Sequence, residues 1–145
     1  MPDIAIKKLR PGAVVPTRGS AFAAGYDLYA CVDAPVVIAP GETKTIGTGI
    51  SCAIPEGWFA ACFARSGLAT KQGLRPANCV GVVDADYRGE YFIALHNDSA
   101  ETRTVEHGER IAQLVFLPFG EANFTEVDEL PETERGAGGF GSTGK

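Results

Sequence analysis

Short apolar runs recur along nearly the whole chain, and Gly, Pro, Asn or Asp residues separate one run from the next. Runs of this kind, about four to eight residues long, are typical of a β-sandwich or barrel. No segment keeps a 3.6-residue apolar period for three helical turns, which excludes a helical bundle. We therefore predict an all-β fold. The expected strands cover residues 4–6, 26–31, 36–38, 43–46, 50–54, 58–65, 79–83, 91–97, 111–117 and 123–127.

A single short helix is expected directly after the strand at 58–65. The hydroxyl of Ser66 is suited to cap the first turn of this helix, and Gly73 is suited to end its last turn. The sequence thus predicts one helical turn or two within a chain made of strands.

Size and composition fit one folded domain. The chain has 145 residues, of which 45% are hydrophobic and 21% charged, and this balance excludes disorder of the whole chain. The 18 Gly and 9 Pro residues are spread throughout, as many tight turns require. We expect the β domain to span residues 1–134. A Gly-rich segment, residues 135–145, follows it, and composition alone predicts a flexible tail there.

The formal net charge of −5 argues against a protein that coats nucleic acid. It still allows a small polyanionic ligand where a few Arg side chains converge or where a cation accompanies the ligand. The four Cys residues form no C-x-x-C pair, so neither a zinc site nor a disulfide framework is expected. The N-terminus has no apolar leader segment, and the longest apolar run, residues 58–64, is too short to cross a membrane. We expect a soluble cytoplasmic protein with reduced, mostly buried thiols.

Three clusters of residues together suggest a site for a nucleoside phosphate. One strand ends in Arg65 and opens a helical turn, whose free N–H groups favour an anion. In the segment 81–89, an apolar strand delivers Asp84 to the edge of a polar loop, where partial burial would suit a general base. In the tail, Arg135 could neutralise phosphate and Phe140 could stack on a base. Each cluster also has a purely structural interpretation: the first could be a capped helix, the second a polar turn and the third a flexible chain end.

In their order and their amino-acid sequence, these clusters closely resemble the motifs of the trimeric dUTPase family. Five segments match in register: AGYDL at 24–28, ARSGL at 64–68, the hairpin segment at 78–89, GERIAQ at 108–113 and the Gly-rich tail at 135–144. The resemblance implies a jelly-roll-like β fold, a homotrimer with active sites at the subunit interfaces, and a mobile arm, residues 135–145, that closes over the site. It also implies Mg²⁺-dependent hydrolysis of dUTP to dUMP and pyrophosphate. That reaction supplies dUMP for dTMP synthesis and keeps uracil out of DNA.

Carried over by position, the resemblance makes Asp84 the general base that activates water for attack on the α-phosphorus. Tyr87 would pack against the deoxyribose and leave no room for a 2′-hydroxyl. A hairpin that reads uracil is also implied, and its main chain would exclude the thymine methyl by shape and cytosine by mismatched donors. The hairpin positions are Asn78, Val82, Val83 and Phe92.

The resemblance also implies how the phosphates and the metal are held. Asp27 matches an acid that contacts metal-bound water or supports the trimer, while the substrate phosphates would hold the Mg²⁺ itself. In the tail, Arg135 matches a phosphate-binding Arg and Phe140 a base-stacking Phe. Gln113 and Arg135 would act with Asp84 in catalysis. The positions that match phosphate-binding residues in the body of the chain are Arg65, Ser66, Gly67 and Gln113.

Two alternatives to dUTP hydrolysis remain open. The first is a dCTP deaminase-like enzyme of similar fold, which would need a Glu poised at the base ring. The second is a catalytically silent nucleotide-binding regulator on the same scaffold. The retention of Asp84 and Tyr87 argues against deamination, and the retention of Asp84, Arg65 and Phe140 argues against a silent protein.

Overall fold

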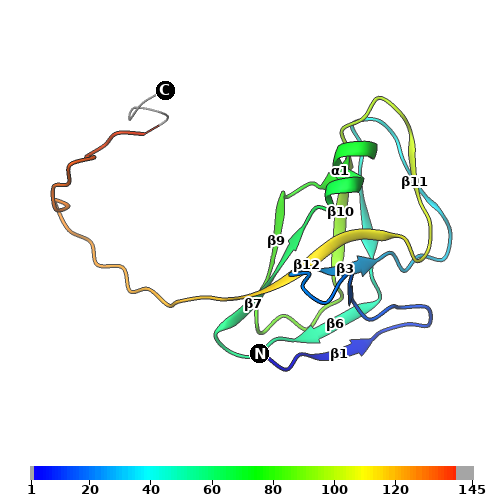
Figure 1. The fold of residues 1–145 in the computed structure, drawn as a ribbon, viewed down its shortest axis with the longest axis horizontal. Helices are drawn as coiled ribbons and strands as arrows, with labels where there is room; N and C mark the ends of the chain where they lie inside the picture. The colour runs from blue at the N-terminus through cyan, green and yellow to red at the C-terminus, as the bar shows by residue number, and fades with distance from the viewer. Residues whose placement is uncertain (1, 140–145) are drawn as a thin grey trace.

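The computed structural model describes residues 2–139 and shows antiparallel β-sheets with one short helix, which confirms the predicted fold class. The largest sheet carries most of the site and has the strand order β2-β3-β12-β7-β9 (Figure 1). Its strands are β2 (Thr17–Arg18), β3 (Tyr26–Tyr29), β12 (Arg110–Pro118), β7 (Trp58–Phe63) and β9 (Val80–Val83).

The remaining strands form three smaller sheets within the described residues. One has the order β5-β10-β8, and the other two are the pairs β1-β6 and β4-β11. These strands are β1 (Ala5–Lys8), β4 (Val36–Ile38), β5 (Thr43–Gly47), β6 (Ile50–Ala53), β8 (Leu74–Pro76), β10 (Phe92–Asn97) and β11 (Arg103–Val105).

The core lies between these sheets and is built from alternate residues of each strand. In β10, Ile93, Leu95 and Asn97 are buried, whereas Phe92 at the start of the strand is 54% exposed. Period-two alternation places one set of side chains in the core and the other set outside it. Phe92 is therefore presented outward at the point where β10 begins.

Helix α1 (Ser66–Gln72) begins one residue earlier than a Ser66 cap would require. Arg65 is the N-cap residue, with the extended dihedrals φ −84° and ψ 126°, and no side chain caps the turn. The predicted Ser66 cap is therefore wrong, because Ser66 already lies inside the first turn. Gly73 does end the helix, as predicted, in the left-handed conformation with φ 70°.

The strand predictions differ from the structure in two further respects. The short strands β2, β8 and β11 were not predicted, because none of these segments of two or three residues forms an apolar run. The predicted strand at 123–127 is absent, because that segment has no pairing partner among the described residues. After Pro118 the chain leaves the domain, and residues 119–137 are exposed (Figure 1).

No helix among the described residues is long and apolar enough to cross a membrane. The four cysteines carry free thiols, of which Cys31, Cys52 and Cys62 are buried and Cys79 is exposed. Most of the thiols are therefore buried, as the sequence predicted.

Candidate active site

A cavity of about 270 Å³ lies where β9 and β10 separate and the loop 84–91 joins them. The floor and walls include Cys62 of β7 and the end of β8 at Pro76. The structure gathers around this one cavity six of the residues predicted to contact the base and the sugar. These residues are Asn78, Val82, Val83, Asp84, Tyr87 and Phe92.

Unpaired main-chain groups border the cavity. Strand β9 pairs with β7 and is the last strand of its sheet, so within the described residues its other edge forms no ladder. Strand β10 begins at Phe92, but its pairing with β8 starts only at Leu95. Main-chain N–H and C=O groups that lack a ladder partner remain free to bind a planar polar ligand. The cavity can therefore recognise a base edge through backbone hydrogen bonds.

Asn78 lies next to β9 because the chain turns sharply there. Cys79 has a φ of +61°, which is rare for a residue with a side chain. A side-chain carbon on Gly81 would lie 3.4 Å from the Asn78 amide nitrogen and 3.3 Å from Cys62. The tighter of these approaches is to Cys62, and the Asn78 amide lies at van der Waals distance beside Gly81 at the cavity wall.

Asp84 and Tyr87 occupy the loop immediately after β9. The Tyr87 N–H donates to the Asp84 carbonyl at 3.2 Å, and the Tyr87 hydroxyl donates to the Glu90 carbonyl at 2.9 Å. The ring of Tyr87 stacks on that of Tyr91, with 6.2 Å between centroids. Asp84 is exposed in the single chain, so the predicted partial burial of its carboxylate is wrong for the chain on its own. The strand ends before Asp84, and the carboxylate stands at the mouth of the cavity.

Behind the cavity, three titratable groups remain neutral. Burial raises the pKa of the Cys62 thiol to about 11, and the neighbouring Cys52 adds to this rise. Burial likewise raises the pKa of the Cys52 thiol and of the Tyr91 hydroxyl. The Tyr91 hydroxyl is buried and has no hydrogen-bond partner among the described residues. These three groups are therefore uncharged at neutral pH.

A second cluster carries the positive charge. Arg65 Nε donates to Asp27 Oδ1 at 2.8 Å, and Arg110 Nη1 donates to Asp27 Oδ2 at 3.2 Å. The Asp27 side chain is only 14% exposed, whereas that of Arg110 is 50% exposed. Two guanidinium groups thus share one carboxylate, which leaves the cluster with a formal charge of +1.

Gln113 completes this cluster. Its side-chain Nε2 donates to the Ala64 carbonyl at 2.8 Å. A side-chain carbon on Gly25 would overlap the Gln113 amide, so this glycine is needed for the close approach. The registers that pair Gln113 with Asp27 on β3 and with Phe63 on β7 explain why three distant segments of the sequence meet here.

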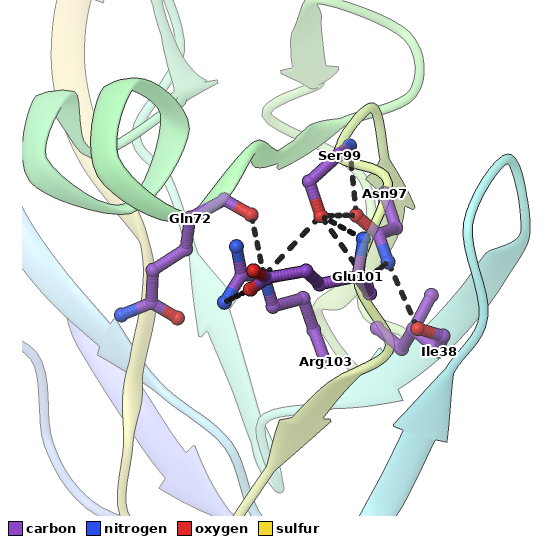
Figure 2. A network of polar contacts seen from close by, with 6 residues as sticks. All are labelled: Ile38, Gln72, Asn97, Ser99, Glu101 and Arg103. Atoms are coloured by element: carbon purple, nitrogen blue, oxygen red, sulfur yellow. Dashed lines mark hydrogen bonds and ion pairs between the residues drawn. The ribbon is translucent and has the colours of Figure 1, made fainter.

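Ser66 and Gly67 are exposed at the start of α1, next to Arg65. The other end of this helix is fixed by a polar network (Figure 2). Arg103 Nε donates to the Gln72 carbonyl at 2.9 Å and also reaches the Ser99 hydroxyl. Asn97, which is fully buried, bonds to Ile38, Ser99 and Glu101. The network holds a helix that is too short to be stable alone.

Asp84 and the charged cluster lie at opposite ends of the β7–β9 ladder. Val83, just before Asp84, pairs with Ala60, whereas Arg65 lies beyond the other end of β7. The five residue steps from Ala60 to Arg65 correspond to roughly 16 Å of extended strand. One chain therefore does not bring Asp84 and Arg65 together.

The tail residues are placed only in part. Arg135 is exposed, and its Nε donates to the nearby Gly138 carbonyl at 2.9 Å. Phe140, predicted to stack on the base, lies outside the described residues.

Comparison with known proteins decides the family. The family model described as dUTPase matches residues 12–144, which is most of the chain. The chain belongs to the dUTPase family.

Characterised members of the dUTPase family are similar over almost their full length. The deoxyuridine 5′-triphosphate nucleotidohydrolase of Nautilia profundicola is 49% identical over 140 residues, 97% of either chain. That of Tolumonas auensis is 46% identical over 132 residues, 90% of this chain and 87% of its own. A solved structure of the Staphylococcus bacteriophage 80alpha dUTPase with dUPNHPP has a TM-score of 0.88 at 31% identity and covers 99% of both chains.

Two residues at the site of this dUTPase-family chain were not among the sequence predictions. Arg110 lies inside the matched segment GERIAQ, so that motif could have pointed to it. Glu90 lines the cavity but follows the last residue of the matched hairpin segment. Its role depends on a contact with Arg10, eighty residues away, and no local pattern signals that contact.

Proposed function

We propose that this protein hydrolyses dUTP to dUMP and pyrophosphate in the cytoplasm. The observation that carries the proposal is one cavity lined by six of the residues predicted to contact the base and the sugar, in a chain of the dUTPase family. Its relatives named deoxyuridine 5′-triphosphate nucleotidohydrolase support the same reaction.

The free main-chain groups of β9 and of the start of β10 would bind the edge of uracil, with the Asn78 amide beside them. A rigid backbone pocket rejects a base with the wrong donors, because its own buried polar groups would then stay unpaired. It rejects the thymine methyl by shape. Tyr87 would pack on the sugar and occupy the space that a 2′-hydroxyl needs.

Asp84 would act as the general base. Its carboxylate takes a proton from water as the water oxygen bonds to the α-phosphorus. The bond from the α-phosphorus to the bridging oxygen breaks on the opposite side, and pyrophosphate leaves with the electron pair. The solvent-facing position of Asp84 at the cavity mouth supports this role, since a base must reach the attacking water.

The phosphate chain would be held by Arg65, Ser66, Gly67 and Gln113, with Arg135 of the tail added from outside. Phe140 would stack on the base. Asp27 accepts from both Arg65 and Arg110, so its main contribution would be to orient Arg65. A guanidinium held by a carboxylate is already oriented before the substrate binds. Less side-chain entropy is therefore lost on binding.

Mg²⁺ fits this site as a metal carried by the substrate. Among the described residues, no group of three or more His, Cys, Asp or Glu side chains could hold a metal ion. Mg²⁺ commonly keeps several waters and binds substrate phosphates. When bound, it would neutralise phosphate charge during the attack. A mutant dUTPase of phage phi11, 25% identical to this chain with a TM-score of 0.81, coordinates a structural Mg(II) ion.

We also propose a homotrimer whose active sites are shared between chains. Along β7, roughly 16 Å separates the general base Asp84 from Arg65 of the charged cluster. This separation supports a shared site, because dUTP hydrolysis needs both residues at one substrate. The exposed segment after Pro118 supports it too, since Phe124 is 98% exposed and Leu130 is 82% exposed in the single chain. Large apolar side chains left this exposed mark a protein interaction surface.

One assay separates this function from its alternatives. The protein is incubated with Mg²⁺ and either dUTP or dCTP, and both pyrophosphate and ammonia are quantified. Pyrophosphate from dUTP without ammonia is the expected result. Ammonia from dCTP would instead identify a deaminase, and nucleotide binding without either product would identify a silent regulator.

A further inference from the structure

Glu90 fixes the loop 84–91 to the body of the domain. Its side chain is only 13% exposed. The Oε1 atom accepts hydrogen bonds from Arg10 Nη2 at 2.6 Å and from the Gly49 N–H at 2.7 Å. Gly49 lies in the turn between β5 and β6, so the carboxylate joins the end of the loop to two separate parts of the chain.

Arg10 is itself held firmly. Its Nη2 also donates to the Cys31 carbonyl at 2.9 Å, and the preceding residue, Leu9, donates its N–H to the Gly49 carbonyl at 2.8 Å. A side-chain carbon on Gly47 would overlap both Arg10 and Glu90. The ion pair therefore lies directly against the main chain at the end of β5.

The same Glu90 also holds Tyr87. Its main-chain carbonyl accepts the hydrogen bond from the Tyr87 hydroxyl at 2.9 Å. The ring of Tyr87 lies over Gly89, where a side-chain carbon would overlap it, and stacks on Tyr91. Tyr87 is still 44% exposed, so these few contacts determine where its ring stands.

We propose that Arg10, which lies outside all five matched segments, sets the discrimination between deoxyribose and ribose by holding Glu90 and, through it, Tyr87. This inference rests on the proposed role of Tyr87 in dUTP hydrolysis. Without Arg10, the Glu90 side chain keeps only the Gly49 N–H as a partner, so it is free to turn toward water. Its carboxylate, left largely buried without a counter-charge, adds to this tendency. The carbonyl that holds the Tyr87 hydroxyl moves with it, and the ring leaves the space beside C2′. Arg10 is thus a positioning residue.

Three variants test the proposal. Arg10→Met removes the charge but keeps an unbranched side chain of similar length, and Arg10→Lys keeps the charge. The double variant Arg10→Met/Glu90→Gln leaves no unpaired carboxylate, so it guards against loss of folding in the first variant. The matched control is Lys44→Met, which removes a cation of similar side-chain exposure, 45% against 39%, from an ion pair remote from the loop.

The readout is the ratio of kcat/KM for dUTP to that for UTP, together with the ratio of Kd values for dUMP and UMP. We expect Arg10→Met and the double variant to lower both ratios by about tenfold, and Arg10→Lys to keep them within about threefold of wild type. Lys44→Met should leave them unchanged. If the folded variants lost kcat/KM equally for dUTP and UTP, so that the kcat/KM ratio and the Kd ratio stayed unchanged, the proposal would be overturned. Failure of the wild-type protein to hydrolyse dUTP would instead contradict the proposed function, and the Kd ratios would still test Arg10.

Discussion

Asp27 and Arg65 are 38 residues apart in the sequence, and Arg65 Nε donates a 2.8 Å hydrogen bond to Asp27 Oδ1. The other carboxylate oxygen accepts from Arg110 at 3.2 Å. Because the acid is largely buried and both cations are more exposed, the carboxylate acts as a fixed anchor for two movable side chains.

The first prediction concerns this anchor. Asp27→Asn keeps the shape of the side chain but removes its charge, so Arg65 is held less firmly. A hydrogen bond to a charged group contributes about 1 kcal/mol more than a neutral one, and we expect kcat/KM for dUTP to fall about fivefold to tenfold. Steady-state kinetics with thermal unfolding measures both effects. Glu42→Gln, in an exposed ion pair with Lys44, is the control, and equal kinetics in the two variants would contradict the anchoring role.

The second prediction concerns the general base. Asp84→Asn should lower kcat by on the order of 10²- to 10⁴-fold while nucleotide binding and assembly persist. Asp86→Asn is the matched control, because Asp86 lies two residues further along the same loop and does not line the cavity. Single-turnover kinetics and equilibrium binding of dUMP separate the chemical step from affinity. If both variants lost activity equally, Asp84 would not be the base.

The third prediction concerns sugar selection. Tyr87→Ala should narrow the gap in kcat/KM between dUTP and UTP, because the space beside C2′ opens. Tyr87→Phe keeps the ring but loses the hydrogen bond to the Glu90 carbonyl, so an intermediate gap is expected. Competition kinetics with both nucleotides gives the ratio directly. A ratio identical in all three proteins would rule out this role for the tyrosine.

The fourth prediction concerns the tail. Truncation after Glu134 should leave the melting temperature and the oligomeric mass nearly unchanged, because the Gly-rich end buries little surface. We expect kcat/KM to fall by about tenfold or more, because Arg135 and Phe140 are lost and the site stays open to water. Phe140→Ala should give part of this loss. Wild-type turnover in the truncated protein, checked by sedimentation, would show that the tail has no part in catalysis.

The fifth prediction concerns alkaline pH. The pKa of Cys62 is raised by burial to about 11, so the folded protein disfavours the thiolate that the unfolded chain forms above pH 9. The associated stability is present below pH 9 and is lost as the pH rises towards 11, by at most about 3 kcal/mol. Denaturant unfolding at a series of pH values should show this decline. It should be shallower in Cys62→Ala and unchanged in Cys79→Ala, whose thiol is exposed. A decline of equal slope in both variants would assign it to other groups.

The sequence predicted the fold class, most strands and the residues of the cavity, because these depend on local alternation and on compact motifs. The segment from Asn78 to Tyr87 is one such motif, and β9 and its loop fold it around a single cavity. Gly73 was recognised for a similar reason, since the local φ of 70° favours glycine at the end of the helix.

The missing parts depend on contacts between distant segments. The Arg10–Glu90 pair joins residues eighty positions apart, and its consequence for Tyr87 passes through a main-chain carbonyl that no side-chain pattern reveals. Residues 123–127 alternate as a strand should, yet a strand requires a partner, and none of the described residues provides one. The exposure of Asp84 followed from the place where β9 ends, which composition does not determine.

The separation of Asp84 from Arg65 along β7 has a genetic consequence. If each site takes its base from one chain and its phosphate cluster from another, two differently inactivated proteins can repair each other. Chains carrying Asp84→Asn and chains carrying Arg65→Ala, unfolded together and refolded at equal amounts, would assemble trimers in which roughly a quarter of the sites have both halves intact. Two inactive alleles would then complement each other within one cell. Either allele expressed beside the wild-type allele would inactivate some of the sites that its chains share with wild-type chains.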